Sequence, residues 1–243
     1  MIQRDLIGTN LLINQKRGMA FNLDTILLAD FVKISPKCEK VIDFGTGNGA
    51  LLLYLSQKTK ATLVGLEIQP NRVELAKQNV LLNGLNDQIE IIQQDIKTFK
   101  VDGFVDVIVS NPPFFKINEQ TKRNITIDET IARHEVELTL EQLINSISRM
   151  LNNNGIAFLI HRPERLTEIT QLLKEHKMSL TTIRFVHPTS TQVANHVLIE
   201  AKKTKKSELK VLPPLILYQA PGTYSDELKK IYGGRSYVTT NIR

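Results

Sequence analysis

The sequence is poor in the residues and patterns on which several common chemistries depend. It holds one cysteine, Cys38, so no disulfide can form within the chain, and a reducing compartment is expected. Because Cys38 precedes a strand-like run, an inert, half-buried thiol is favoured over a nucleophile or a metal ligand. No stretch approaches about 18 uninterrupted apolar residues, and the first ten residues lack an apolar segment of signal-peptide length. We therefore expect a soluble, cytoplasmic protein with no membrane partner.

Patterns typical of metal sites and of activated nucleophiles are also missing. The five histidines are scattered, and strand-end hydrogen bonds rather than a metal are expected for His161, His187 and His196. The chain has no G-x-S-x-G nucleophile elbow and no P-loop lysine pattern. The sequence therefore predicts no metal site and gives no support to nucleophilic catalysis.

Length and charge favour one folded domain with a polyanionic partner. A chain of 243 residues with 42% hydrophobic residues can bury about 70 to 75% of its unfolded surface, enough for one sizeable α/β domain. No internal repeat or low-complexity linker interrupts it. The formal net charge of +6 leans toward polyanionic partners, although many mildly basic proteins have none.

Strand and helix signals alternate along the chain. Seven apolar runs are typical of strands, at residues 41–45, 61–68, 88–95, 105–111, 155–162, 181–188 and 195–203. End signals predict helices at 24–34, 70–83, 140–153 and 163–177. These signals are an N-cap at Asp24, a first-turn Pro70, the pair Asn83-Gly84, and a capping box formed by Thr139 and Gln142.

This alternation predicts the fold class α/β, with a seven-stranded, mostly parallel sheet and helices on both faces. The short connection between the last two strands predicts that they pair antiparallel. We expect one domain over residues 1–243, with a helical lead-in at 1–38, a core at 39–203, and a C-terminal appendage at 204–243 that ends in a short helix.

A glycine-rich turn, DFGTGNGA at 43–50, follows the first predicted strand. Glycines permit a tight turn and let backbone amides approach a ligand at a helix N-terminus. The turn also satisfies the dinucleotide pattern G-x-G-x-x-A, and many such turns only shape a strand-to-helix connection. Asp43 would repel a pyrophosphate but attract the ammonium group of S-adenosylmethionine. The residues therefore favour S-adenosylmethionine, and a loop-capping role for Asp43 stays open.

Acidic residues end the second and third predicted strands. Glu67 can accept hydrogen bonds from both hydroxyls of a ribose, as it would equally for NAD. Asp95 can accept a hydrogen bond from the adenine amino group of the cofactor, although capping the next turn explains it equally well in isolation. Because four successive strands end in such residues, the predicted cofactor-binding set is Asp43, Gly45, Thr46, Gly47, Glu67, Ile68, Asp95, Ile96 and Asn111.

The fourth predicted strand ends in SNPPF at 110–114, a rigid corner because prolines lack an N–H and fix the backbone. If the Asn111 side-chain oxygen and the Pro112 carbonyl each accept one hydrogen of a planar amine, positive charge developing on its nitrogen is stabilised. Phe114 can stack on a target base, an interaction of about 1 to 3 kcal/mol. The predicted catalytic residues are Asn111, Pro112, Pro113 and Phe114, although two prolines can also simply terminate a strand.

Together, D-x-G-x-G-x-G, the acidic strand ends and N-P-P-F resemble class I S-adenosylmethionine-dependent amino-methyltransferases. Over nearly its whole length, the chain more narrowly resembles the tRNA1(Val) adenine-37 N6-methyltransferase family, through QKRGMAFNLDTILLADF, NPPFF with ARHE, and GTYSDELKKIYGG. The resemblance implies a Rossmann-like methyltransferase fold, S-adenosylmethionine as the donor, and the adenine beside the tRNA anticodon as the acceptor. It also suggests that Lys16, Arg17 and Phe21 of the lead-in fold over the active site. Phe114 stands where the motif more often has tyrosine, which loses a hydroxyl but keeps the stacking face.

Basic side chains near the predicted corner suit a phosphate backbone. The loop at 112–135 is too long for a mere connection, and a lysine cluster flanks the last strand. The predicted substrate-binding residues are Phe114, Lys116, Arg133, His134, Lys203 and Lys206, and solvated surface charge is the alternative for the basic ones.

Other functions stay open from the sequence alone. Motifs of the NPP-aromatic type also occur in methyltransferases that act on DNA adenine, guanine amines and protein glutamine. A nicotinamide-dependent oxidoreductase would use the glycine turn and Glu67 but would leave NPPF unexplained. A noncatalytic RNA-binding protein would leave the acceptor corner unused. The sequence does not indicate whether the protein self-associates.

Overall fold

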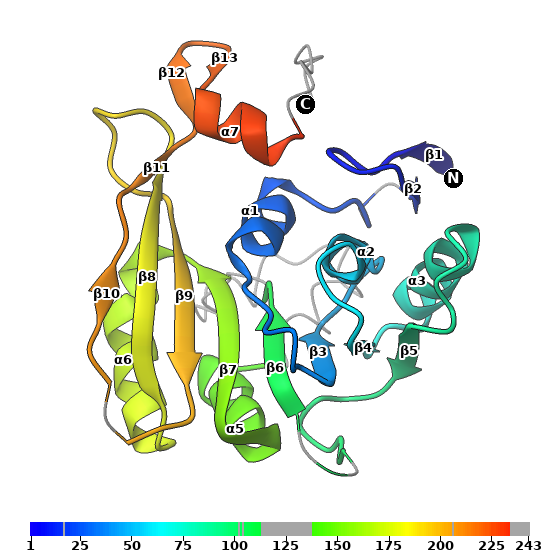
Figure 1. Ribbon diagram of the computed structural model, residues 1–243, viewed down its shortest axis with the longest axis horizontal. Helices are drawn as coiled ribbons and strands as arrows, with labels where there is room; N and C mark the ends of the chain where they lie inside the picture. The colour runs from blue at the N-terminus through cyan, green and yellow to red at the C-terminus, as the bar shows by residue number, and fades with distance from the viewer. Residues whose placement is uncertain (17, 102, 104, 113–137, 206, 234–243) are drawn as a thin grey trace, which may run out of the picture.

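A central mixed sheet organises the chain, which the computed structural model describes except at residues 17, 102, 104, 113–137, 206 and 234–243 (Figure 1). Nine described strands form this sheet, in the order β10-β8-β9-β7-β6-β3-β4-β5, with β11 also paired to β8. Their bounds are β3 (Lys40–Phe44), β4 (Thr62–Glu67), β5 (Ile89–Gln93), β6 (Val105–Ser110), β7 (Leu151–His161), β8 (Ser179–His187), β9 (His196–Lys202), β10 (Lys210–Val211) and β11 (Leu215–Ile216).

Strand directions agree with the sequence prediction. The neighbours β3–β4, β4–β5, β3–β6 and β6–β7 are parallel, whereas β9 runs antiparallel to both β7 and β8. Along the chain, the sheet grows from β3 in one direction through β4 and β5, and in the other through β6 and β7. The strand order therefore reverses at β3, and the carboxyl ends of β3, β4 and β6 meet beside that point.

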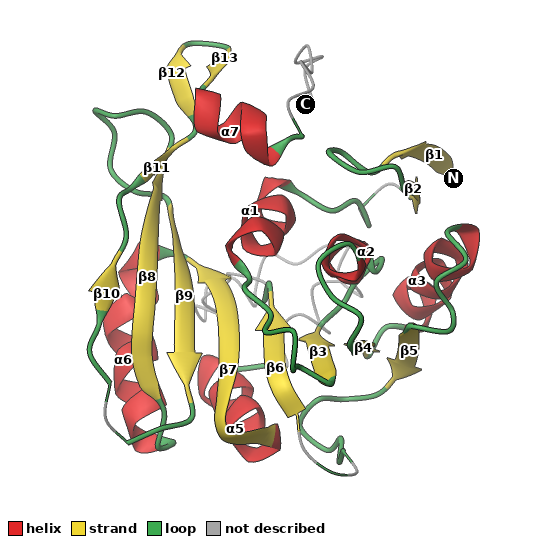
Figure 2. Cartoon of the chain, in the orientation of Figure 1, coloured by secondary structure: helices red, strands yellow, loops and turns green. Residues whose placement is uncertain are grey.

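Helices cover both faces of the sheet (Figures 1 and 2). One hydrophobic core joins the sheet to α1 (Leu23–Phe31), α2 (Ala50–Ser56) and α3 (Pro70–Leu82). A second core joins the other face to α5 (Leu140–Met150) and α6 (Leu166–Glu175), which follows the 3-10 turn η2 (Pro163–Arg165). All seven residues of α2 are buried. Because α2 has no polar face, its sequence shows no helical periodicity, and this helix was not predicted.

Helix ends mostly follow the sequence signals. Pro70 lies in the first turn of α3 and Asn83 is its C-cap. The capping box at the start of α5 is present in full, although α5 ends at Met150 rather than 153. The prediction of Asp24 as the N-cap of the first helix is wrong. Asn22 is the N-cap, and its side chain accepts a hydrogen bond from the Thr25 backbone N–H.

The two ends of the chain add strands that the sequence did not predict, whereas the predicted short C-terminal helix is present as α7. The lead-in holds an antiparallel hairpin, β1 (Ile2–Asp5) with β2 (Leu12–Gln15), ahead of α1. Residues after 204 contribute β10 and β11 to the sheet, which therefore has more than seven strands. The short hairpin β12 (Tyr218–Ala220) with β13 (Thr223–Tyr224) then leads to α7 (Asp226–Ile231). The two ends of the chain lie against each other at Gly8 and Gly233. Their backbones are so close that a Cβ at Gly233 would lie 2.9 Å from the Gly8 Cα.

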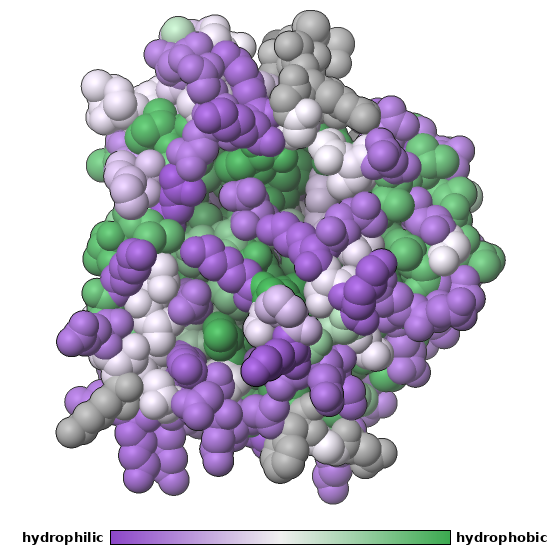
Figure 3. Space-filling view, viewed as in Figure 1, coloured by the Kyte–Doolittle hydropathy of each residue, from purple (hydrophilic) through white to green (hydrophobic). Residues whose placement is uncertain are grey.

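The surface in Figure 3 is mostly polar, with apolar areas among the charged side chains. Some of these lie on the side of α3 and the first hairpin, where Ile2, Leu12, Leu81 and Leu82 are exposed. Among the described helices, none is both long and apolar enough to cross a membrane.

Candidate functional site

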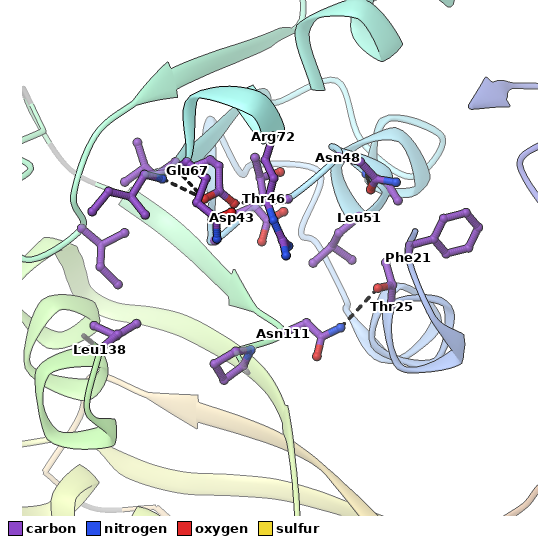
Figure 4. Close-up of a pocket in the computed structure, with 18 of the residues that line it drawn as sticks. Phe21, Thr25, Asp43, Thr46, Asn48, Leu51, Glu67, Arg72, Asn111 and Leu138 are labelled. Carbon is purple, nitrogen blue, oxygen red and sulfur yellow. Dashed lines mark hydrogen bonds between the residues drawn. The ribbon is translucent and has the colours of Figure 1, made fainter. Parts of the chain in front are cut away.

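A cavity of about 560 Å³ opens at the carboxyl ends of β3, β4 and β6, beside the point where strand order reverses. All nine residues of the predicted cofactor-binding set line it, and so does Pro112. Figure 4 shows four of them, Asp43, Thr46, Glu67 and Asn111, whose side chains reach the cavity from several elements. The other lining residues are Met19, Ala20, Phe21, Asn22, Thr25, Asn48, Ala50, Leu51, Leu66, Gln69, Arg72, Gln94, Lys97, Leu138 and Arg162.

Asp43, the penultimate residue of β3, is only 2% exposed. Its Oδ2 is buried and has no hydrogen-bond partner among the described residues. Burial raises the pKa of Asp43 from 3.8 to about 7, an effect that Thr46 opposes and the negative charge of Glu67 reinforces. A buried carboxylate oxygen without a partner is costly unless a cation or donor meets it. This carboxylate therefore fits a positively charged ligand group in the cavity.

Glu67 ends β4 and ties the glycine turn to the following segment. Its Oε2 accepts a hydrogen bond from the Gly47 N–H at 3.0 Å, and its Oε1 accepts from the N–H groups of Ile68 and Gln69, both at 2.9 Å. A carboxylate has about four acceptor positions, so about one remains for a ligand. The predicted contact with two ribose hydroxyls therefore requires one of these backbone bonds to open.

Asp95 lies two residues beyond the end of β5 and lines the cavity with Ile96. Its Oδ1 accepts from the Lys97 N–H at 2.9 Å, and its Oδ2 forms an ion pair with the Lys97 Nζ at 3.3 Å. The turn-capping role that the sequence left open is therefore present. Because Asp95 also faces the cavity, it can still accept a hydrogen bond from a ligand.

Asn111 follows β6, whose last residue, Ser110, donates a buried hydrogen bond to the Phe44 carbonyl at 2.9 Å. The Asn111 Nδ2 donates to the Thr25 Oγ1 at 3.2 Å (Figure 4). It also lies 3.5 Å from the Asn22 Oδ1, and both partners are at the start of α1. With its nitrogen engaged there, the Asn111 Oδ1 is the group left to accept a hydrogen bond within the cavity.

The remaining predicted residues are not brought to this cavity among the described positions. Lys203 follows β9 near the amino end of β7, and its Nζ donates to the Leu151 carbonyl at 2.8 Å. That is the opposite end of the sheet from Asn111. The other predicted catalytic and substrate-binding residues lie outside the described residues: Pro113, Phe114, Lys116, Arg133, His134 and Lys206.

The sequence reasoning missed several residues of the site. Asn22 and Thr25 carry a readable signal, since an N-cap asparagine with its partner three residues later marks a helix start. Gly65 carries another, because a glycine inside a strand often marks a close approach. A Cβ at Gly65 would lie 2.8 Å from the Thr46 side chain, so the glycine turn rests directly on this position. Of the three lead-in residues that the resemblance suggested, Phe21 lines the cavity, Lys16 is not among the lining residues, and Arg17 lies outside the described residues.

Cys38 and the three strand-end histidines fit the structural roles expected from the sequence. Burial raises the pKa of the half-buried Cys38 thiol from 9.0 to about 11. Each of the three strand-end histidines has a hydrogen bond: His161 accepts from the Arg162 N–H, His187 contacts the Gln192 carbonyl, and His196 contacts Asn195. No group of three potential metal ligands occurs in the part of the chain that the structure describes.

Comparison with known proteins gives consistent similarities. A family model described as methyltransferase small domain matches residues 22–185. A relative from Porphyromonas gingivalis is 30% identical over 237 residues, covering 93% of this chain and 91% of its own. Another from Vibrio campbellii is 28% identical over 216 residues, covering 88% of this chain and 87% of its own. Both are named tRNA1(Val) (adenine(37)-N6)-methyltransferase.

Solved structures share the fold. One described as a predicted O-methyltransferase from Agrobacterium tumefaciens has a TM-score of 0.68 at 19% identity, over 90% of this chain and 100% of that one. A ribosomal protein L11 methylase from Lactobacillus delbrueckii has a TM-score of 0.54 at 20% identity, over 77% of this chain and 82% of that one. The Rossmann-like class I methyltransferase fold expected from the sequence is therefore confirmed.

Proposed function

The chain belongs to the methyltransferase small domain family and to the family of the tRNA1(Val) (adenine(37)-N6)-methyltransferases, and from this premise we propose that it methylates the exocyclic N6 amine of an adenine in tRNA. The expected nucleotide is adenine 37 of tRNA1(Val), as named for its relatives. The observation that carries the proposal is the cavity where Asp43 and Asn111 lie at the carboxyl ends of adjacent strands.

The cavity suits S-adenosylmethionine, which supplies an activated methyl group on a sulfonium when bound. Asp43 would hold its ammonium group, because the Oδ2 is buried without a hydrogen-bond partner among the described residues. Glu67 would accept from a ribose hydroxyl through its remaining acceptor position. The exposed Ile68 and the buried Ile96 offer apolar surface for a flat adenine ring beside Asp95. A dinucleotide fits less well, since a pyrophosphate would meet the negative charge of Asp43.

The acceptor amine would lie against Asn111 and Pro112. An exocyclic amine is a weak nucleophile because its lone pair is delocalised into the ring, so the protein must act by geometry. The Asn111 Oδ1 and the Pro112 carbonyl would each accept a hydrogen bond from the amine and would stabilise positive charge as it develops on nitrogen. As the nitrogen–carbon bond forms, the sulfur–carbon bond breaks and its electron pair stays on the sulfur, and the surplus proton of the amine would pass to solvent. Phe114 would stack on the base, as predicted from the sequence.

A tRNA substrate agrees with the formal net charge of +6. Cationic side chains also line the cavity, including Arg162, which follows β7, and Lys97, which pairs with Asp95. The predicted RNA contacts of Lys116, Arg133, His134, Lys203 and Lys206 stay predictions, as does a cytoplasmic location. Another planar amine, in rRNA, DNA or protein glutamine, is the alternative acceptor within the same chemistry.

The test is transfer of a labelled methyl group to unmodified tRNA, with rRNA, DNA and protein acceptors in parallel. We expect Asn111→Ala to lower kcat about 100-fold or more, because its oxygen acts mainly in the transition state. Binding of S-adenosylhomocysteine, measured by calorimetry, should change much less. Asn86→Ala, at an exposed asparagine outside the cavity, is the matched control. Unchanged turnover in Asn111→Ala would remove Asn111 from its role, and transfer only to a non-tRNA acceptor would reassign the substrate.

A further inference from the structure

The side-chain amide of Asn111 has an acceptor end, the oxygen, and a donor end, the NH2 group, and only one orientation of the amide supports the proposed reaction. An asparagine carbonyl oxygen accepts hydrogen bonds, whereas its NH2 group only donates them. If the amide were reversed, an NH2 group would face the hydrogens of the acceptor amine, so two donors would confront each other. Something in the protein must therefore decide which way Asn111 points.

The start of α1 carries a chain of hydrogen bonds with a fixed direction. The Asn22 Nδ2 donates to the Asp24 Oδ2 at 2.9 Å, which leaves the Asn22 Oδ1 as an acceptor. This oxygen accepts from the Thr25 hydroxyl at 3.4 Å and caps the helix through the Thr25 N–H at 3.3 Å. Because the single hydroxyl proton of Thr25 is used toward Asn22, its Oγ1 can only accept from Asn111. The donor that Asn111 presents to it is the Nδ2, at 3.2 Å.

Asp24, where this series of hydrogen bonds begins, is held in place by a different part of the fold. Asp24 is 8% exposed, and its other oxygen, Oδ1, lies 3.3 Å from the His196 Nε2 at the start of β9. Asp24 is thus anchored from the sheet on one side and directs Asn22 on the other. The direction of every hydrogen bond from Asp24 to Asn111 follows from these contacts.

We propose that Asn22 and Thr25 are positioning residues that hold the Asn111 amide with its oxygen toward the acceptor amine. This inference deepens the proposed methyl transfer and rests on it for its catalytic consequence. The orientation of Asn111 itself does not depend on which acceptor is methylated. Neither residue reacts; both act through Asn111.

Paired substitutions at residue 25 test the catalytic consequence. Thr25→Val keeps the shape but removes the hydroxyl, whereas Thr25→Ser keeps the hydroxyl. We expect Thr25→Val to lower kcat for methyl transfer to tRNA about tenfold or more, with a smaller change in KM. Thr25→Ser should restore most of the rate. Thr170→Val, at an exposed threonine on α6, is the matched control.

A second measurement reports the orientation without activity. In proton–nitrogen correlation spectra, the side-chain NH2 signal of Asn111 is the one that disappears in Asn111→Ala. We expect its protons to exchange with water slowly in the wild type and in Thr25→Ser, and several-fold faster in Thr25→Val. Unchanged S-adenosylhomocysteine affinity would show that the Thr25→Val cavity is intact.

The outcomes separate the two proposals. If the wild type does not methylate tRNA but the exchange of the Asn111 amide depends on the Thr25 hydroxyl, the substrate assignment fails and the positioning role stands. If the wild type is active and Thr25→Val matches it in both kcat and amide exchange, the positioning role is overturned. Equal losses in Thr25→Val and Thr25→Ser would also overturn it, because the hydroxyl would then not be the cause.

Discussion

Replacing Asp43 with asparagine should make the ligand-free protein more stable at high pH while weakening its binding of cofactor. The substitution keeps the shape of the side chain and removes its charge. In the wild type this charge is buried, one of its oxygens has no hydrogen-bond partner among the described residues, and the nearby Glu67 is also negative. The same feature that suits an ammonium group therefore destabilises the ligand-free fold.

The magnitude follows from the pKa of Asp43, which burial raises from 3.8 to about 7. Because the folded state holds this proton more tightly than the unfolded state, stability from this group is fully present below pH 3.8 and is lost as pH rises through about 7. Over the whole range this amounts to about 4 kcal/mol. Between pH 5 and pH 8, ionisation of Asp43 should lower the free energy of unfolding of the wild type by about 3 kcal/mol. The free energy of unfolding of Asp43→Asn should not fall for this reason.

The assay is urea unfolding of the wild type and of Asp43→Asn at pH 5 and pH 8. Taking the difference between the two proteins removes the pH dependence of all other groups. Asp87→Asn, at an exposed carboxylate, is the control and should follow the wild type at both pH values. A wild-type to Asp43→Asn difference that is the same at pH 5 and pH 8 would refute the argument, because the buried charge would then not be the destabilising feature.

Ionisation of Asp43, which lowers the stability of the ligand-free protein, should instead strengthen cofactor binding. An ammonium group prefers ionised Asp43, so the affinity of the wild type for S-adenosylhomocysteine should rise as pH increases from 5 to 7. Loss of a charge-assisted hydrogen bond should weaken binding by Asp43→Asn about 10- to 100-fold at pH 8 and flatten this pH dependence. Calorimetry at each pH measures both effects, and equal affinities at pH 8 would exclude the ammonium contact.

Two further predictions concern stability and reactivity. Gly65→Ala should lower the free energy of unfolding by about 1 to 3 kcal/mol, because its Cβ would lie 2.8 Å from the side chains of both Thr46 and Ile91. Urea unfolding measures this change, and a decrease below about 0.3 kcal/mol would show that these neighbours move aside without cost. Cys38 should react with iodoacetamide roughly 100-fold more slowly in the folded protein than in urea at pH 8, since its pKa is raised to about 11; equal rates measured by mass spectrometry would contradict this.

The residues predicted to bind the cofactor line one cavity, because parallel strands impose a simple rule. Asp43, Glu67 and Asn111 are recognisable as polar residues that close apolar runs, and the carboxyl ends of parallel strands lie at one edge of the sheet. Register then brings them together without further information from the sequence. Asp95 follows the same rule two residues late, after β5 has ended at Gln93.

The first helix shows where local reading fails. Asn22 and Asp24 are both residue types that cap helices, so the local sequence alone does not choose between them. Asn22 is the cap because Asp24 is required inside the helix, where it faces His196 of β9. The contact that decides between the two candidates comes from a strand far along the chain.

The chain ends illustrate the same limit in another way. The strands β10 and β11 have two residues each, and they exist by pairing with β8. Segments this short carry no alternation of apolar and polar residues that a sequence pattern could detect. Likewise, the antiparallel course of β9 places Lys203 at the opposite end of the sheet from Asn111, which its basic neighbours in the sequence do not reveal. Its predicted RNA contact stays a prediction.

The sequence by itself determined the fold class and the strand-end residues that line the cavity, because strand periodicity and strand-end chemistry are local properties. The tertiary structure alone decided how Asn111 is oriented. Its side-chain nitrogen donates hydrogen bonds to Asn22 and Thr25, which lie 89 and 86 residues away along the chain. Contacts at such separations depend on how α1 packs against the sheet, and that packing is a property of the whole fold rather than of any short stretch of sequence.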